Sequence, residues 1–147
     1  MHAMLMHAYA PHLKPARGSL AEHYSRWGLF SCVEVDSSTY AIPSIATVRS
    51  WCAQVPSGFV FHFKAYGLFC GQSVPLNALP RAVRELPSMS TVGAGKGAGT
   101  GGVRVSGKSI SSEGLAACWQ RFNLVCLEVQ QQEKMGMVIF QFQVVPA

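Results

Sequence analysis

The sequence predicts an α/β fold in which parallel strands alternate with helices, and three observations support this prediction. Apolar segments of strand length occur at residues 31–36, 59–65 and 137–142. Segments with apolar residues at helical spacing lie between them, as is typical of parallel βαβ units. Each strand has one polar and one apolar face, because neighbouring residues of a strand point to opposite sides. A sheet covered by helices on both faces is apolar on both, so the pattern favours a barrel.

The first predicted helix precedes the first strand. Ser19–Glu22 has the pattern of a capping box, in which a hydroxyl and a glutamate satisfy two free backbone N–H groups. We expect this helix to run through Trp27 and to end at Gly28, because glycine is typical of helix C-termini. The strand at residues 31–36 then follows directly.

Three further helices are expected between the remaining strands. The second helix begins at Pro43-Ser44 and ends before Pro56, since its apolar residues recur at helical spacing. Residues 76–86 predict a short helix that Pro80 either opens or breaks. A long helix is expected over residues 113–134, with Gly136 as its end.

Residues 88–112 differ from the rest of the chain. They are mostly Gly, Ser, Ala and Thr with isolated basic residues, and such a composition predicts a flexible insertion. We therefore divide the chain into three parts. Residues 1–87 hold the first βα units, residues 88–112 the insertion, and residues 113–147 the long helix and the third strand.

Gly102–Ser109, within this insertion, matches the phosphate-loop pattern G-x-x-x-x-G-K-[ST]. A phosphate loop joins a buried strand to a helix N-terminus, where backbone N–H groups bind phosphate. The Gly-rich residues before Gly102 do not form such a strand. Nucleotide binding through this segment is therefore the weakest of the functional alternatives.

Polar side chains from all three strands are expected on one shared face. The candidate catalytic residues are Glu34, Asp36 and Lys64, and the candidate ligand-binding residues are Asp36, His62, Lys64 and Gln141. The opposite face carries the apolar pairs that helices would cover: Val33 and Val35, Phe61 and Phe63, and Phe140 and Phe142. No metal centre is assigned.

This polar face has two interpretations that the residues leave open. In the first it is a binding or acid–base site, where Lys64 holds an anion or lowers the pKa of a neighbouring acid. Asp36 or Glu34 would then act as base or metal ligand. In the second it is a network of ion pairs that only fills the interior, since buried charges must be paired in any case.

The composition and charge of the chain indicate which classes of partner and which cellular location to expect. The 147 residues are 49% hydrophobic and 13% charged, yet no apolar run reaches the about 18 residues of a membrane span. The net charge of +5 comes from scattered basic residues, so nucleic acid is not the favoured partner. Five cysteines without C-x-x-C spacing predict buried free thiols and a cytoplasmic, reducing location, with organellar import as the alternative.

Four ordered segments resemble the YecE-like family, also called domain of unknown function 72. They are residues 33–40 (Val-Glu-Val-Asp-Ser-Ser-Thr-Tyr), 43–51, 56–65 and 134–142 (Lys-Met-Gly-Met-Val-Ile-Phe-Gln-Phe). The resemblance implies a TIM barrel, but it supplies no established activity, cofactor or catalytic role. The family's opening strand and the second half of the barrel have no counterpart here. We therefore expect the amino-terminal part of a barrel, with about three parallel strands.

This reading predicts a small polar or phosphorylated ligand at the carboxyl ends of the strands, where barrels of this type place their sites. In that hypothesis Asp36 is the base or metal ligand, Lys64 the anion clamp and Gln141 the orienting group. The alternative is a non-catalytic binding or scaffold remnant. Open sheet edges also predict self-association, because unpaired edge strands recruit other strands.

Overall fold

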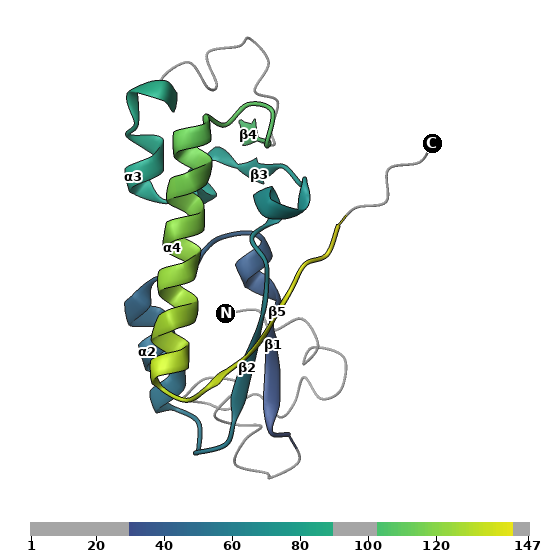
Figure 1. The fold of residues 1–147 in the computed structure, drawn as a ribbon, viewed down its shortest axis with the longest axis vertical. Coiled ribbons are helices and arrows are strands. Elements are labelled where there is room, and N and C mark those ends of the chain that lie inside the picture. Colours follow the sequence, from purple (N-terminus) through teal and green to yellow (C-terminus); the bar gives the residue numbers. More distant parts are fainter. Residues whose placement is uncertain (1–29, 90–102, 143–147) are drawn as a thin grey trace, which may run out of the picture.

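A computed structural model of the chain describes residues 30–89 and 103–142 (Figure 1). Its strands are β1 (Cys32–Val35), β2 (Val60–Lys64), β3 (Val74–Pro75), β4 (Arg104–Val105) and β5 (Met135–Ile139). Its α-helices are α2 (Ile45–Ala53), α3 (Arg81–Arg84) and α4 (Ser112–Gln131), and short 3-10 helices join several of these elements. The predicted capping box at Ser19–Glu22 and the helix through Trp27 lie outside the described residues.

The main sheet has three parallel strands in the order β1-β2-β5, which confirms the predicted α/β class with parallel pairing. β1 pairs with β2 in register from Cys32 opposite Val60 to Val35 opposite Phe63. Helix α2 connects these two strands, and α4 leads into β5. The three strands of this sheet thus lie in their chain order, with β3 and β4 outside it, as expected for a barrel segment. A second, antiparallel pair consists of β3 and β4.

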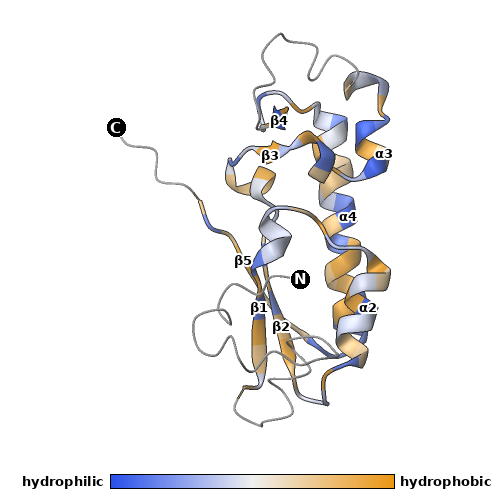
Figure 2. Cartoon of the chain, turned by 180° about the vertical axis from the view of Figure 1, so that it is seen from behind, coloured by the Kyte–Doolittle hydropathy of each residue, from blue (hydrophilic) through white to orange (hydrophobic). Residues whose placement is uncertain are grey.

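Within the described residues, helices cover one face of this sheet (Figure 1). The side chains on that face are buried, as predicted for the first two strands: Val33, Val35, Phe61 and Phe63. They join one apolar core with buried residues of α2 and α4, such as Val48, Cys118 and Phe122. Figure 2 shows hydrophobic residues in β1, in β2 and in the helices beside them. The covered face therefore contributes these four residues to the core, and helices, turns and loops supply the others.

Helix α2 begins as the sequence predicts. The Ser44 hydroxyl is the N-cap and accepts a hydrogen bond from the backbone N–H of Thr47 at 3.0 Å. Residues 76–86 do not form one helix, because Pro80 lacks an N–H and interrupts the hydrogen-bond pattern. A 3-10 turn over Leu76–Ala78 precedes Pro80, which is the N-cap of α3.

Helix α4 starts one residue before the prediction and ends three residues earlier. Ser111 caps it by accepting a hydrogen bond from the backbone N–H of Gly114 at 3.0 Å. The residue with left-handed backbone after the helix is Glu133, with φ of 55°. Gly136 was expected to end the helix, but it lies within β5.

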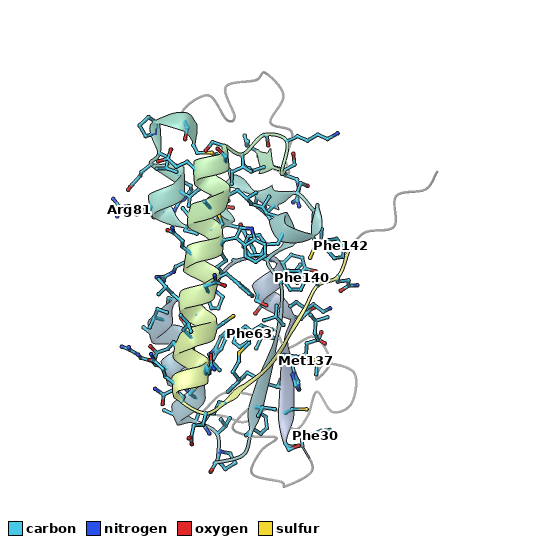
Figure 3. All side chains as sticks on the ribbon, in the orientation of Figure 1. Phe30, Phe63, Arg81, Met137, Phe140 and Phe142 are labelled. Atoms are coloured by element: carbon cyan, nitrogen blue, oxygen red, sulfur yellow. The ribbon has the colours of Figure 1, made fainter. Side chains whose placement is uncertain are left out.

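β5 begins two residues earlier than predicted and ends at Ile139 rather than residue 142. Its register against β2 shifts between Phe61 and Phe63. The shift and the early end of pairing place Phe140 and Phe142 beyond the strand, where they are 45% and 67% exposed. Phe140 still stacks on Trp119 of α4, so the predicted helical cover is partial for Phe140, and Phe142 is the more exposed ring. Figure 3 shows Phe63 near α4, whereas Phe140 and Phe142 follow β5.

Gly136 is needed at this register shift because β5 passes close to His62. A Cβ atom at position 136 would overlap the Nδ1 atom of His62. The same Nδ1 atom accepts a hydrogen bond from the backbone N–H of Met137 at 3.1 Å. His62 thus serves to dock β5 against β2.

The last part of the predicted insertion is ordered. Residues 90–102 lie outside the described residues, but β4 pairs with β3, and Val105 is fully buried. Ile110 is also buried and packs in the core. Two apolar side chains therefore anchor residues 103–112, although the composition of this segment is otherwise polar and small.

The cysteines are all free thiols. Cys52, Cys70 and Cys118 are buried and Cys126 is half-buried, as expected. Cys32 is exposed, which corrects the prediction for this position. It lies at the start of β1, before the alternation that buries Val33 and Val35.

Candidate functional site

The polar residues gather where β1 and β2 reach their carboxyl ends. β1 ends at Val35, and Asp36 begins a 3-10 helix over Asp36–Thr39. The sequence placed Asp36 in the strand itself, so its position is corrected by one residue. The turn nevertheless keeps the Asp36 carboxylate beside Lys64, the last residue of β2.

Lys64 forms ion pairs with both predicted carboxylates. Its Nζ atom lies 2.6 Å from Asp36 Oδ1 and 3.2 Å from Glu34 Oε1. The Asp36 side chain is 12% exposed, and those of Lys64 and Glu34 are 21% and 28% exposed. The hydrogen bond to Asp36 raises the pKa of Lys64 above its ordinary value, although partial burial opposes this. Lys64 is therefore a permanent cation and hydrogen-bond donor here.

Ser38 joins the ends of β1 and β2. Its side chain is fully buried, and its hydroxyl oxygen lies 2.6 Å from the carbonyl oxygens of Val35 and of Lys64. The hydroxyl hydrogen is shared between these two acceptors. The contact holds the turn that carries Asp36 against the end of β2. The sequence signal for Ser38 was a hydroxyl residue directly after a buried strand, to which we assigned no role.

A pocket of about 540 Å³ opens at this end of the sheet. We call it the strand-end pocket, and its lining residues are Asp36, Thr39, Tyr40, Lys64, Gln72, Gln141 and Phe142. Three of the predicted site residues, Asp36, Lys64 and Gln141, therefore meet at one place. Glu34 contacts Lys64 without lining the pocket, and His62 lies away from it against Met137.

Sequence reasoning missed Thr39 and Gln72. Thr39 Oγ1 is buried and has no hydrogen-bond partner in the part of the chain that the structure describes. Gln72 follows a 3-10 turn, and its Nε2 donates to the backbone oxygen of Gln141 at 3.1 Å. No strand pattern marks Gln72, since it comes from a loop. Thr39 was visible only as part of the hydroxyl run after β1.

Aromatic rings form the apolar walls of the strand-end pocket. Tyr40 is 60% exposed, and Phe142 also projects into solvent. Phe142 stacks on Phe140, whose ring centroid is 6.5 Å away, and Phe140 stacks on Trp119 at 6.2 Å. This stack supports the Phe142 wall from the helix side. The pocket thus combines polar groups with exposed ring faces.

A family model described as protein of unknown function DUF72 matches residues 1–146. The chain belongs to the DUF72 family. The match confirms the resemblance seen in the four sequence segments. Searches of curated proteins and of solved structures each gave no match. Family membership assigns no reaction, so the chemistry of the DUF72 chain must be argued from the residues of its pocket.

A second pocket adjoins the first in this DUF72 chain. Its volume is about 380 Å³, and we call it the Arg104 pocket, lined by Thr39, Tyr40, Gln72, Ser73, Val74, Pro75 and Arg104. Thr39, Tyr40 and Gln72 line both pockets. Arg104 lies in β4 and donates hydrogen bonds to the hydroxyl and the carbonyl oxygen of Ser73. The two pockets therefore share one wall.

The phosphate-loop pattern falls on a strand and a turn over the described residues 103–109. Arg104 and Val105, in the middle of the pattern, are strand β4 rather than loop. Lys108 is exposed in the turn that follows and lines neither pocket. Nucleotide binding through Gly102–Ser109 therefore stays a prediction, which the pairing of Arg104 and Val105 with β3 does not favour.

Residues 30–89 and 103–142 contain no helix that is long and apolar enough to cross a bilayer. Within the same ranges no three His, Cys, Asp or Glu side chains gather in a way that would hold a metal ion.

Proposed function

We propose that this DUF72 chain binds a small organic ligand with several hydroxyl groups in the strand-end pocket. The observation that carries the proposal is the lining itself. Asp36 offers a carboxylate acceptor, Gln72 and Gln141 are amide residues, and Thr39 offers a buried hydroxyl without a partner. A few convergent polar groups beside apolar walls are typical of small-molecule sites.

The charge of the site favours a neutral ligand over an anion in this pocket. Lys64 carries one positive charge between the two carboxylates of Asp36 and Glu34, so these three residues sum to about −1 at neutral pH. We therefore replace the anion-clamp hypothesis for Lys64 with a positioning role. Lys64 holds Asp36 in place, and Asp36 accepts a hydrogen bond from a ligand hydroxyl.

The aromatic walls suit a hydroxylated ring. Sugars and cyclic polyols present C–H groups on one ring face, and these pack against aromatic side chains while the hydroxyls reach polar groups. Tyr40 and Phe142 offer such surfaces on the pocket that Asp36 and Gln141 also line. Phe142 is already stacked on Phe140, so less side-chain freedom is lost on binding.

A matched pair of variants tests this proposal. Asp36→Asn and Glu34→Gln each remove one carboxylate partner of Lys64, but only Asp36 lines the pocket. The wild-type protein is first screened by thermal shift against glycerol, ribose, glucose and inositol. We expect at least one ring compound to stabilise it. Asp36→Asn should weaken that compound about tenfold or more, because a hydrogen bond to a charged group is worth about 1.5–3 kcal/mol.

Glu34→Gln should bind the same compound with wild-type affinity. Equal weakening by both variants would point to a general loss of structure or charge and would contradict a site at Asp36. If no compound binds and Asp36→Asn leaves stability unchanged, the scaffold interpretation is favoured instead.

Self-association stays a prediction. Among the described strands of the main sheet, β1 and β5 form the edges. Met137 and Phe140 are exposed on and just after β5, which adds apolar surface to that edge. Sedimentation velocity over a range of concentrations tests this prediction, and a monomer at every concentration contradicts it.

A further inference from the structure

The two adjoining pockets differ in whether their charged side chains form ion pairs. In the strand-end pocket the charges are Asp36 and Lys64, which pair with each other. Among the described residues that line the Arg104 pocket, Arg104 alone is charged. Within the described residues Arg104 forms no ion pair, because its hydrogen bonds go to Ser73. The positive charge of Lys64 in the strand-end pocket is thus paired with a carboxylate, whereas that of Arg104 is not.

Ser73 fixes the orientation of the Arg104 guanidinium. The Nε atom donates to Ser73 Oγ at 2.9 Å, and the Nη2 atom donates to the Ser73 carbonyl oxygen. A guanidinium has five N–H donors in a rigid plane, so donors remain beyond those that Ser73 engages. Phosphate and carboxylate oxygens match this planar donor geometry. Ser73 therefore holds the side chain without neutralising it.

The wall between the pockets provides further polar groups. Thr39 and Gln72 line both pockets, and Thr39 Oγ1 is the buried oxygen that lacks a partner. A ligand that spans the shared wall would pass this hydroxyl. Its neutral end would lie beside Asp36, and its other end would lie beside Arg104.

We propose that Arg104, supported by Ser73, forms a phosphate-binding subsite, so that the ligand of this chain is a phosphate monoester of a hydroxylated compound. The identity of the hydroxylated part rests on the function proposed above, whereas the phosphate subsite rests on Arg104 alone. The anion clamp expected at Lys64 is thus assigned to a residue of β4, in the segment whose sequence predicted flexibility.

The test compares three probes: inorganic phosphate, ribose and ribose 5-phosphate. We expect wild-type protein to bind ribose 5-phosphate at least about tenfold more tightly than ribose, since charge-assisted hydrogen bonds to phosphate are about twice as strong as neutral ones. Arg104→Gln should remove this advantage and leave ribose binding unchanged. Lys108→Gln is the matched control, because it removes a nearby exposed positive charge that lines neither pocket.

Asp36→Asn separates the two proposals. If both hold, this variant weakens ribose and ribose 5-phosphate by the same factor and leaves inorganic phosphate unaffected. If Asp36→Asn changes nothing while Arg104→Gln still abolishes phosphate binding, the proposed function fails and the subsite stands. If ribose binds but phosphorylation adds nothing, the subsite fails and the proposed function stands.

Two outcomes overturn the subsite directly. Equal losses in Arg104→Gln and Lys108→Gln would show general electrostatic attraction, and no loss in Arg104→Gln would show that Arg104 does not contact the phosphate. Arg104→Lys keeps the charge without the planar fork, and it replaces Arg104→Gln if the latter unfolds early. It should bind inorganic phosphate more weakly than the wild-type protein, because lysine does not replace the planar fork of arginine, and unchanged binding would count against the subsite.

Discussion

The two faces of the β1-β2-β5 sheet are built from alternating residues of the same strands, yet they have different roles. On the covered face Phe61 and Phe63 are buried against helices. On the open face Glu34, which lies between Val33 and Val35, and Lys64, which follows Phe63, remain partly exposed. A single alternation in sequence therefore separates the face that stabilises the fold from the face that carries the candidate site. Changes on one face should leave the other largely intact.

The largest effect is expected from Phe63→Ala. Phe63 is fully buried at the centre of the sheet, and removal of a buried phenylalanine side chain costs about 3–5 kcal/mol of unfolding free energy. Glu34→Gln on the open face should cost less than about 1 kcal/mol, because partly exposed ion pairs contribute little. Urea unfolding of both variants measures the contrast. Equal losses would mean that the two faces are not energetically distinct.

An intermediate effect is expected from Gly136→Ala at the register shift of β5. The added Cβ would meet His62 Nδ1, and a forced overlap of this kind costs about 1–3 kcal/mol. His62→Ala removes the obstructing ring, so the double variant should recover most of the loss caused by Gly136→Ala. A double-variant cycle by urea unfolding tests this coupling. Strictly additive losses would show that His62 does not set the path of β5.

The smallest effects are expected from pH, and they differ between the two sides of the sheet. Among the covering helices, Arg49 donates two hydrogen bonds to Glu128, which lowers the pKa of that carboxyl. The stability that this ion pair contributes is present above the ordinary glutamate pKa. It is lost as pH falls through the lowered pKa of Glu128. Arg49 is 63% exposed, so the loss is small.

On the open face the pH dependence of stability has the opposite sign. The raised pKa of Lys64 gives a contribution that is complete below the ordinary lysine pKa and is lost as pH rises through the raised value. Thermal unfolding against pH should therefore lose its acid-side slope in Glu128→Gln and its alkaline-side slope in Lys64→Met. The reverse assignment would contradict the two ion-pair geometries.

The sequence predicted the covered face well, because period-two alternation in β1 and β2 and helical spacing in α2 and α4 are local signals. It was only partly right for Phe140 and Phe142, since a register shift at Gly136 depends on contact with His62, which lies 74 residues away in the chain. It also did not indicate that Val105 is buried, because the burial of a two-residue strand depends on its distant partner, β3.

The site was predictable in part. Asp36, Lys64 and Gln141 belong to strands or strand ends, and parallel pairing brings such ends together. Gln72 and Arg104 come from segments without a strong periodic pattern, so only the folded chain places them beside the pocket. Loops carry many binding residues for this reason, and sequence patterns locate them poorly.

The most direct test of the central claim, that the open face binds the ligand, is an NMR titration with ribose or the tightest compound of the screen. The side-chain NH₂ resonances of Gln72 and Gln141 should shift with saturation, because both residues line the strand-end pocket. Those of Gln54 and Gln132, at the ends of α2 and α4, should stay in place. Shifts confined to Gln54 and Gln132, or spread evenly over all four, would contradict a site on the open face.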